Sequence, residues 1–122
     1  MARIVIVEDE IEVLLLVGSV LQQAGHDTVS ASSVAEAQAI INSKEQTFDL
    51  VFTDVELGDN KEGGLTIGKE LAEVRNGTPV LYTSGRPATD GMQSLFVEPS
   101  AFLPKPYTAQ QLEQAISNLL RK

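Results

Sequence analysis

The chain has 122 residues, 43% of them hydrophobic, which is the size and composition of one soluble globular domain. Its 17 acidic and 9 basic residues give a formal net charge of −8, which disfavours binding to nucleic acid or anionic membranes. The lack of cysteine excludes disulfides and thiolate metal sites, and neither a membrane-spanning stretch nor a secretory signal is recognisable, so we expect a cytoplasmic protein.

The first half of the chain alternates strand-like and helix-like patterns. Residues 3–8 hold a short β-branched run that ends in acid, which is typical of a strand covered on both faces. A helix follows and ends near Gly25; its apolar residues at helical spacing are Ile11, Leu14, Leu15 and Leu21. A weak strand at residues 28–31 precedes a second helix. That helix carries on one face Val34, Ala37 and Ile41.

The alternation continues through a third and a fourth unit. Residues 49–54 form an apolar run that again ends in a carboxylate, and a Gly-rich acidic loop follows at residues 58–64. The helix expected next is marked by Ile67, Leu71 and Val74. Residues 79–83 predict a fourth strand. Residues 88–97 predict only a poor helix with weak apolar periodicity.

A fifth unit completes the pattern. Residues 101–103 predict a short strand, and a helix begins near residue 108. The apolar stripe of this helix comprises Leu112, Ala115, Ile116, Leu119 and Leu120. Five βα units with tight connections imply an α/β fold in which helices cover both faces of a parallel sheet. We expect one domain over residues 1–122, with no output domain.

Charged and hydroxyl side chains follow the predicted strands. Open parallel sheets bind ligands beyond the carboxyl ends of their strands. Glu8 and Asp9 end the first strand and Asp54 the third. Carboxylates that lie close together repel one another unless a cation is present, and Mg²⁺ is the natural cation for an all-oxygen site. Ser84 and Lys105 follow the fourth and fifth strands.

These residues together suit phosphoryl transfer. Asp54 can form an acyl phosphate, while Lys105 and the Ser84 hydroxyl provide a cation and a hydrogen-bond donor for phosphoryl oxygens. Each residue alone has a simpler explanation, because Asp9 could cap a helix, Asp54 and Ser84 could serve in turns, and Lys105 could be solvated. Their placement at one end of one sheet favours the phosphoryl site.

Four motifs occur in a fixed order along the chain. They are Val7-Glu8-Asp9-Glu10, Leu50-Val51-Phe52-Thr53-Asp54, Pro79-Val80-Leu81-Tyr82-Thr83-Ser84-Gly85 and Leu103-Pro104-Lys105-Pro106-Tyr107. In this order and spacing the sequence closely resembles, over essentially its whole length, the receiver domains of bacterial response regulators. The resemblance implies a flavodoxin-like (βα)5 doubly wound parallel sheet with strand order 2-1-3-4-5.

The resemblance also implies roles for particular residues. Asp54 would be the phosphoacceptor, and Lys105 matches the lysine of the family. Mg²⁺ would be bound by Glu8, Asp9, Asp54 and the backbone carbonyl of Glu56. Ser84 and Phe102 stand at the two switch positions, and plain core packing is the less favoured alternative for Phe102. The Lys105–Pro106 bond would be cis.

The implied function is signalling by a single-domain response regulator. A phosphohistidine of a histidine kinase or histidine phosphotransfer protein would donate to Asp54. The chain would then signal in one of two ways. It would change shape and contact a protein target through the face of helix four, strand five and helix five, or it would relay the phosphate. It would not be an enzyme, although it would assist its own phosphoryl transfer and dephosphorylation. The N-terminal Met and the regular last helix favour a natural single-domain protein over an excised receiver.

Some features depart from the usual receiver pattern. Gly58 stands where a proline is common, the acidic loop at residues 59–64 is slightly long, and the fourth helix is poorly specified. Glu56 and Arg86 flank the expected site, and we hypothesise that they pair across its mouth and restrict water. Two solvated side chains that contribute almost nothing are the alternative.

Two other functions compete with the receiver interpretation. A receiver-like interaction module that never uses phosphate would have no need for the repulsive acidic cluster. The second is an enzyme, either a nucleotide-binding protein or a Mg²⁺-dependent phosphatase with an aspartyl nucleophile. A nucleotide-binding protein would need a glycine-rich phosphate loop, and neither GxxxxGK[ST] nor GxGxxG after the first strand is present. A haloacid-dehalogenase type phosphatase would need Asp-x-Asp after its first strand, whereas Asp54-Val55-Glu56 follows the third.

Overall fold

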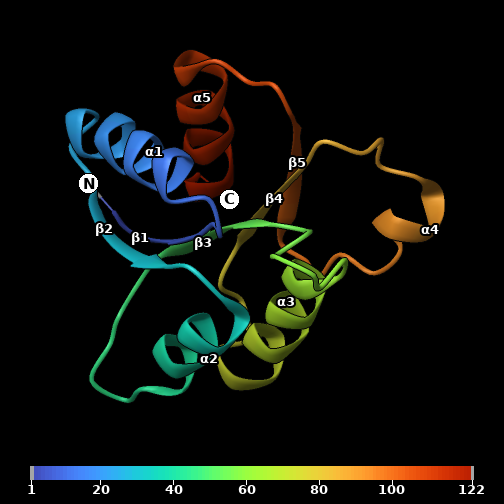
Figure 1. Ribbon diagram of the computed structural model, residues 1–122. Coiled ribbons are helices and arrows are strands. Elements are labelled where there is room, and N and C mark those ends of the chain that lie inside the picture. Colours follow the sequence, from blue (N-terminus) through green and yellow to red (C-terminus); the bar gives the residue numbers. More distant parts are fainter. Residues whose placement is uncertain (1, 122) are drawn as a thin grey trace.

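Strands and helices alternate regularly in the computed structural model, which describes residues 2–121 (Figure 1). The strands are β1 (Arg3–Val7), β2 (Asp27–Ala31), β3 (Leu50–Asp54), β4 (Val80–Ser84) and β5 (Ser100–Pro104). The helices are α1 (Ile11–Gln23), α2 (Val34–Asn42), α3 (Gly63–Val74), α4 (Asp90–Gln93) and α5 (Ala109–Leu120). All strand pairs are parallel, in the order β2-β1-β3-β4-β5. The predicted flavodoxin-like fold is therefore confirmed.

The sheet divides the core into two layers. Side chains alternate across each strand, so Val5 and Val7 of β1 pack with α2 and α3, whereas Ile4 and Ile6 pack with α1 and α5. Figure 1 shows these two helix pairs on opposite faces of the sheet. The β-branched run of the first strand is buried because both of its faces are covered.

The buried stripe of α1 differs from the one expected. Leu14 and Leu21 are buried as predicted, but Ile11 and Leu15 are 56% and 68% exposed. Val17 and Gly18 face the core instead. Residues three to four apart share a helix face, so Leu14, Val17 and Gly18 lie in phase whereas Leu15 is rotated away. Val74, at the end of α3, is likewise 47% exposed rather than core.

The fourth helix is short, as its weak pattern predicted. Only Asp90–Gln93 is helical, and Thr89 caps it by accepting a hydrogen bond from the Met92 amide. In Figure 1 this helix stands apart from the two helix pairs. Among the described residues no helix is both long and apolar enough to cross a membrane.

The start of α3 lies directly against the end of β3. The helix begins at Gly63, within the segment that the sequence predicted as loop. The Gly64 amide donates to the Val55 carbonyl oxygen at 2.9 Å. A Cβ atom on Gly64 would lie 2.2 Å from the Asp54 carbonyl oxygen, so only glycine fits here without moving the backbone. This contact holds the residue after β3 in place.

Candidate functional site

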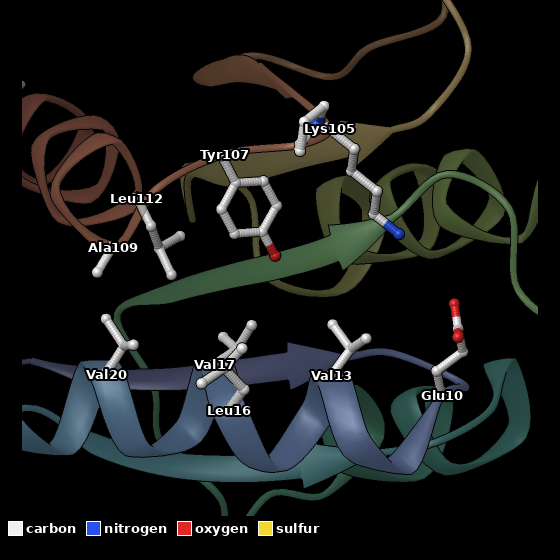
Figure 2. Close-up of a pocket in the computed structure, with 10 residues that line it drawn as sticks. Glu10, Val13, Leu16, Val17, Val20, Lys105, Tyr107, Ala109 and Leu112 are labelled. Atoms are coloured by element: carbon white, nitrogen blue, oxygen red, sulfur yellow. The ribbon is translucent and has the colours of Figure 1, made fainter.

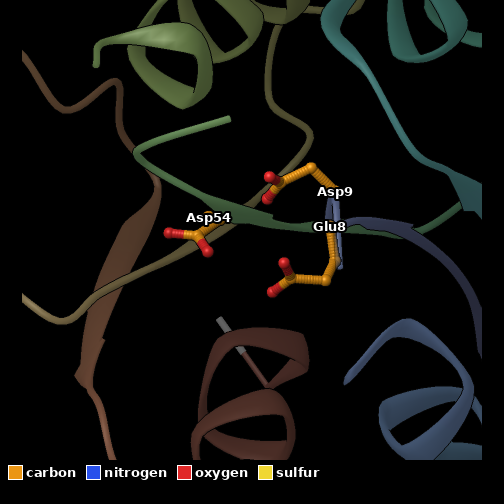
Figure 3. Close-up of side chains that lie close together, drawn as sticks. All are labelled: Glu8, Asp9 and Asp54. Carbon is orange, nitrogen blue, oxygen red and sulfur yellow. The ribbon is translucent and has the colours of Figure 1, made fainter. Parts of the chain in front are cut away.

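Three carboxylates converge where β1 and β3 end. One carboxylate oxygen from each of Glu8, Asp9 and Asp54 lies within 4.8 Å of the other two, and Figure 3 shows the three side chains close together where these strands end. Glu8 and Asp54 are only 4% and 5% exposed, whereas Asp9 is exposed. Adjacent parallel strands present their ends at the same edge, which is why Glu8 and Asp54 meet here although they lie 46 positions apart.

Lys105 is the cation nearest to this cluster. Its Nζ lies 2.6 Å from Asp54 Oδ2 and 3.6 Å from Glu8 Oε1. The position of Lys105 follows from the sheet, because its amide donates to the Ser84 carbonyl oxygen at 3.0 Å just beyond β4 and β5. The Lys105–Pro106 bond is cis, as expected, and the Glu98–Pro99 bond is cis as well.

One buried oxygen of Asp54 is left unpaired. Asp54 Oδ2 binds Lys105, but Oδ1 is buried and has no hydrogen-bond partner among the described residues. A buried oxygen without a partner costs free energy. A cation among the three carboxylates would satisfy it, and an all-oxygen donor set of this kind suits Mg²⁺. The residues present therefore fit a magnesium ion.

Burial sets the direction of the pKa shift for the two buried carboxyl groups, and the contact with Asp54 sets it for Lys105. Burial raises the pKa of the Glu8 carboxyl from 4.5 to about 7, against the opposing effects of the Glu10 amide and the Lys105 ammonium. Burial also raises the pKa of Asp54, although the hydrogen bond from Lys105 acts in the opposite direction. For Lys105, burial alone would lower the pKa, but the hydrogen bond and charge of Asp54 raise it overall.

The stability of the metal-free protein should therefore depend on pH. Between pH 4.5 and about 7 the folded state holds a proton on Glu8 that the unfolded chain has released, so the free energy of unfolding falls as pH rises. The loss from Glu8 is at most about 3 kcal/mol. Urea unfolding in EDTA at pH 5 and pH 8 should show it, and Glu8→Gln should flatten the dependence. An unchanged slope in Glu8→Gln, equal to that of the exposed control Glu12→Gln, would contradict this.

Asp9 does not cap α1, contrary to one interpretation of the sequence. The N-cap residue is Glu10, which makes no side-chain capping bond. The Asp9 carboxylate instead accepts a hydrogen bond from the Gly58 amide at 3.1 Å. Glu8 Oε2 accepts from the Glu10 amide at 3.0 Å. Asp9 thus ties the β1 end to the loop after β3, which keeps its carboxylate beside Asp54.

Ser84, Glu56 and Arg86 form a connected group at the mouth of the site. The Ser84 hydroxyl lies 2.8 and 3.0 Å from the two oxygens of the Glu56 carboxylate. Arg86 Nε and Nη2 donate to Glu56 Oε2 at 3.0 and 2.8 Å, so the predicted Glu56–Arg86 contact is present. The Arg86 amide also donates to the Ser84 hydroxyl oxygen at 3.0 Å. The bond between Ser84 and Glu56 was not predicted.

Phe102 belongs to an aromatic stack. It is partly buried and lies 5.9 Å from Phe96, with nearly parallel rings. Phe96 in turn stacks on Tyr82 at 4.2 Å, and the Tyr82 hydroxyl accepts a hydrogen bond from the Val97 amide. The sequence indicated Phe102 but not Phe96, because Phe96 lies in an irregular segment where periodicity carries no information. The stack joins β4 and β5 to the segment after α4.

An apolar groove of about 530 Å³ opens beside the site, between α1 and the start of α5 (Figure 2). Its lining residues are Glu10, Val13, Leu16, Val17, Val20, Lys105, Pro106, Tyr107, Ala109 and Leu112. Glu10 and Lys105 lie at one end of it in Figure 2. The groove therefore borders the carboxylate cluster and presents apolar surface next to it, including Leu16, which is 65% exposed.

Several known proteins are similar to this chain. It is 31% identical over 125 residues to the alginate biosynthesis transcriptional regulatory protein AlgB of Pseudomonas aeruginosa, and 28% identical over 122 residues to a CpxR homolog, a transcriptional regulatory protein, of Haemophilus influenzae. These alignments cover 97% and 100% of the chain but only 26% and 52% of the two relatives. The chain thus spans about half the length of such relatives, or less.

Solved structures of other proteins are similar to this chain in both fold and sequence. A response regulator receiver protein from Sinorhizobium medicae has a TM-score of 0.87 and 31% identity, over 98% of this chain and 94% of that one. A receiver domain protein from Clostridium thermocellum has a TM-score of 0.83 and 26% identity, over 99% and 95%. The sequence pattern of the response regulator receiver domain matches residues 4–117. The chain therefore belongs to the response regulator receiver domain family of two-component signalling.

Proposed function

We propose that this chain accepts a phosphoryl group on Asp54 from a phosphohistidine of a histidine kinase or histidine phosphotransfer protein, and signals as a single-domain response regulator. The observation that carries the proposal is the pairing of the buried Asp54 with Lys105 inside the carboxylate cluster. Such a cluster is costly to keep without a function, which argues against a module that never uses phosphate. The chain acts as a signalling protein, not as an enzyme with a separate substrate.

The transfer step is an in-line displacement at phosphorus. A carboxylate oxygen of Asp54 forms the new O–P bond as the N–P bond of phosphohistidine breaks, and the electron pair returns to the imidazole nitrogen. Lys105 neutralises charge on the phosphoryl oxygens and on Asp54, to which it is already hydrogen bonded. Positioning and charge neutralisation are the main requirements of this chemistry.

The metal site of the proposal consists of Glu8, Asp9, Asp54 and the backbone carbonyl of Glu56. The unpaired Asp54 Oδ1 and the short distances among the three carboxylates support it. A bound Mg²⁺ supplies charge neutralisation for the incoming phosphoryl oxygens. Glu8 and Asp9 would hold the ion beside Asp54, because both lie immediately after β1, next to the end of β3.

The signal is a change at Ser84 and Phe102. The Ser84 hydroxyl donates to the phosphorylated Asp54, and Phe102 then shifts into the space beside it. The stack of Phe102 on Phe96 supports a link to α4, since Phe102 lies in β5 and Phe96 lies in the segment between α4 and β5. The face of α4, β5 and α5 would thereby change its affinity for a downstream protein, or the phosphoryl group would be relayed onward.

The phosphodonor in this proposal is a protein in the cytoplasm. The apolar groove between α1 and α5 supports a protein donor, because exposed apolar surface beside Asp54 gives a partner a place to pack (Figure 2). The net charge of −8 supports the exclusion of nucleic acid and anionic membranes as partners.

Intact-mass measurement after incubation with acetyl phosphate tests the proposal. We expect an adduct of one phosphoryl group in Mg²⁺ and none in EDTA. Beryllofluoride, which mimics the phosphoryl group, should bind under the same conditions and provides a check that does not depend on the small donor. If acetyl phosphate gives no adduct and beryllofluoride does not bind, a phosphate-independent interaction module would be favoured.

The contact between Arg86 and Glu56 leads to a prediction about phosphoryl lifetime. Arg86 reaches across the mouth of the site to Glu56 and to the Lys61 carbonyl oxygen, where it can restrict water. We expect Arg86→Ala to speed dephosphorylation by roughly twofold to tenfold, the range of one exposed charge-assisted contact. Loss of the adduct after removal of acetyl phosphate, followed by mass, measures it. An unchanged rate would show that the contact does not limit water.

A further inference from the structure

The Ser84 hydroxyl is already hydrogen bonded in the unphosphorylated protein. Its oxygen accepts a hydrogen bond from the Arg86 amide, and it lies 2.8 and 3.0 Å from the two oxygens of Glu56. A serine hydroxyl has a single hydrogen. That hydrogen can therefore be given to Glu56 or to a phosphoryl oxygen on Asp54, but not to both.

Glu56 is well held in this position. Two nitrogens of Arg86 donate to its Oε2 at 2.8 and 3.0 Å, and Arg86 Nη2 also reaches the Lys61 carbonyl oxygen at 3.3 Å. The Glu56 side chain is 27% exposed, so these bonds are only partly screened by solvent. The Glu56 carboxylate thus lies within hydrogen-bond distance of the hydroxyl that a phosphoryl oxygen on Asp54 would need as a donor.

We propose that Glu56 is an internal competitor for the Ser84 hydroxyl: its carboxylate holds the switch serine in the unphosphorylated protein and must release it when Asp54 is phosphorylated. This inference rests on the proposed phosphorylation of Asp54 and assigns Glu56 as a positioning residue that acts through Ser84. By reciprocity, the factor by which the bond between Glu56 and Ser84 weakens recognition of the phosphoryl group equals the factor by which the phosphoryl group weakens that bond.

The affinity for beryllofluoride in Mg²⁺, followed by ¹⁹F NMR, tests the competition. We expect Glu56→Ala to bind roughly threefold to tenfold more tightly than the wild type, which corresponds to one hydrogen bond released. Glu56→Gln should show a smaller gain, because its amide oxygen still accepts a hydrogen bond but carries no charge. Asp59→Ala removes an equal charge from an exposed residue of the neighbouring loop and should change the affinity less than twofold.

The same substitution in a Ser84→Ala background separates competition from simple repulsion. Alanine has no hydroxyl, so Glu56→Ala should then change the affinity less than twofold, whereas relief of charge repulsion would give the same gain in both backgrounds. An equal gain in both backgrounds, an equal gain from Asp59→Ala, or no gain in the Ser84 background overturns the inference alone. A wild type that binds neither beryllofluoride nor phosphate overturns the proposed function and the inference with it.

Discussion

The Asp54→Asn variant is expected to gain no phosphoryl group from acetyl phosphate, whereas the wild type gains one in Mg²⁺. The substitution keeps the size and shape of the side chain but replaces a nucleophilic carboxylate oxygen by an amide. It also removes one of the charges that Lys105 neutralises at 2.6 Å. Intact-mass spectrometry measures the result, and the expected loss is complete.

The matched control for this variant is Asp59→Asn, the same chemical change at an exposed position in the loop after β3. It should be labelled like the wild type. Thermal unfolding of both variants checks that the fold persists, so a missing adduct cannot be explained by unfolding. A full adduct on Asp54→Asn would place the acceptor elsewhere, and peptide mapping would then identify the modified carboxylate.

The Gly64→Ala variant is expected to lose on the order of 3 kcal/mol or more of folding free energy. The added methyl group would lie 2.2 Å from the Asp54 carbonyl oxygen and 2.8 Å from the Val55 Cα. Both are backbone atoms, so relief requires α3 or the end of β3 to move. Because that movement displaces Asp54, phosphorylation should slow as well. Urea unfolding and the rate of acetyl phosphate labelling measure the two effects.

Gly18→Ala provides a control with the opposite sign. Gly18 also lies in a helix and is buried, but an added methyl group would meet only Ile6 Cδ1 at 4.0 Å, an ordinary van der Waals distance. Alanine is favoured over glycine inside a helix by about 0.5–1 kcal/mol, so this variant should be slightly more stable than the wild type. Equal destabilisation by both substitutions would show that the contact between Gly64 and Asp54 is not the cause.

The order and type of the elements could be predicted from the sequence because the central strands β1, β3 and β4 are short and apolar on both faces, and helical patterns separate most of the strands. All five strands and the weakness of the fourth helix were confirmed. Which face of a helix is buried was harder to predict. Ile11 and Leu15 fit a helical repeat but are exposed, since several apolar stripes coexist on α1 and only packing against β1 and α5 selects one.

The candidate site was predictable as a list of residues but not as a set of contacts. A carboxylate at the end of one parallel strand must lie near the end of its neighbour, so the meeting of Glu8 and Asp54 followed from the strand pattern. Which atom of Asp54 binds Lys105 and which oxygen stays unpaired did not follow. The same is true of Asp9, whose contact with the Gly58 amide depends on how the loop after β3 folds back.

The sequence by itself determined the parallel sheet, its layers and the group of charged residues at one edge, because hydrophobic periodicity and strand ends are local properties of the chain. Only the tertiary structure decided how the site is connected: the Glu56 carboxylate on the Ser84 hydroxyl, Phe96 between Tyr82 and Phe102, and Gly64 against Asp54. These contacts join residues on different elements. They depend on side-chain directions and distances of a few ångströms, which no local pattern encodes.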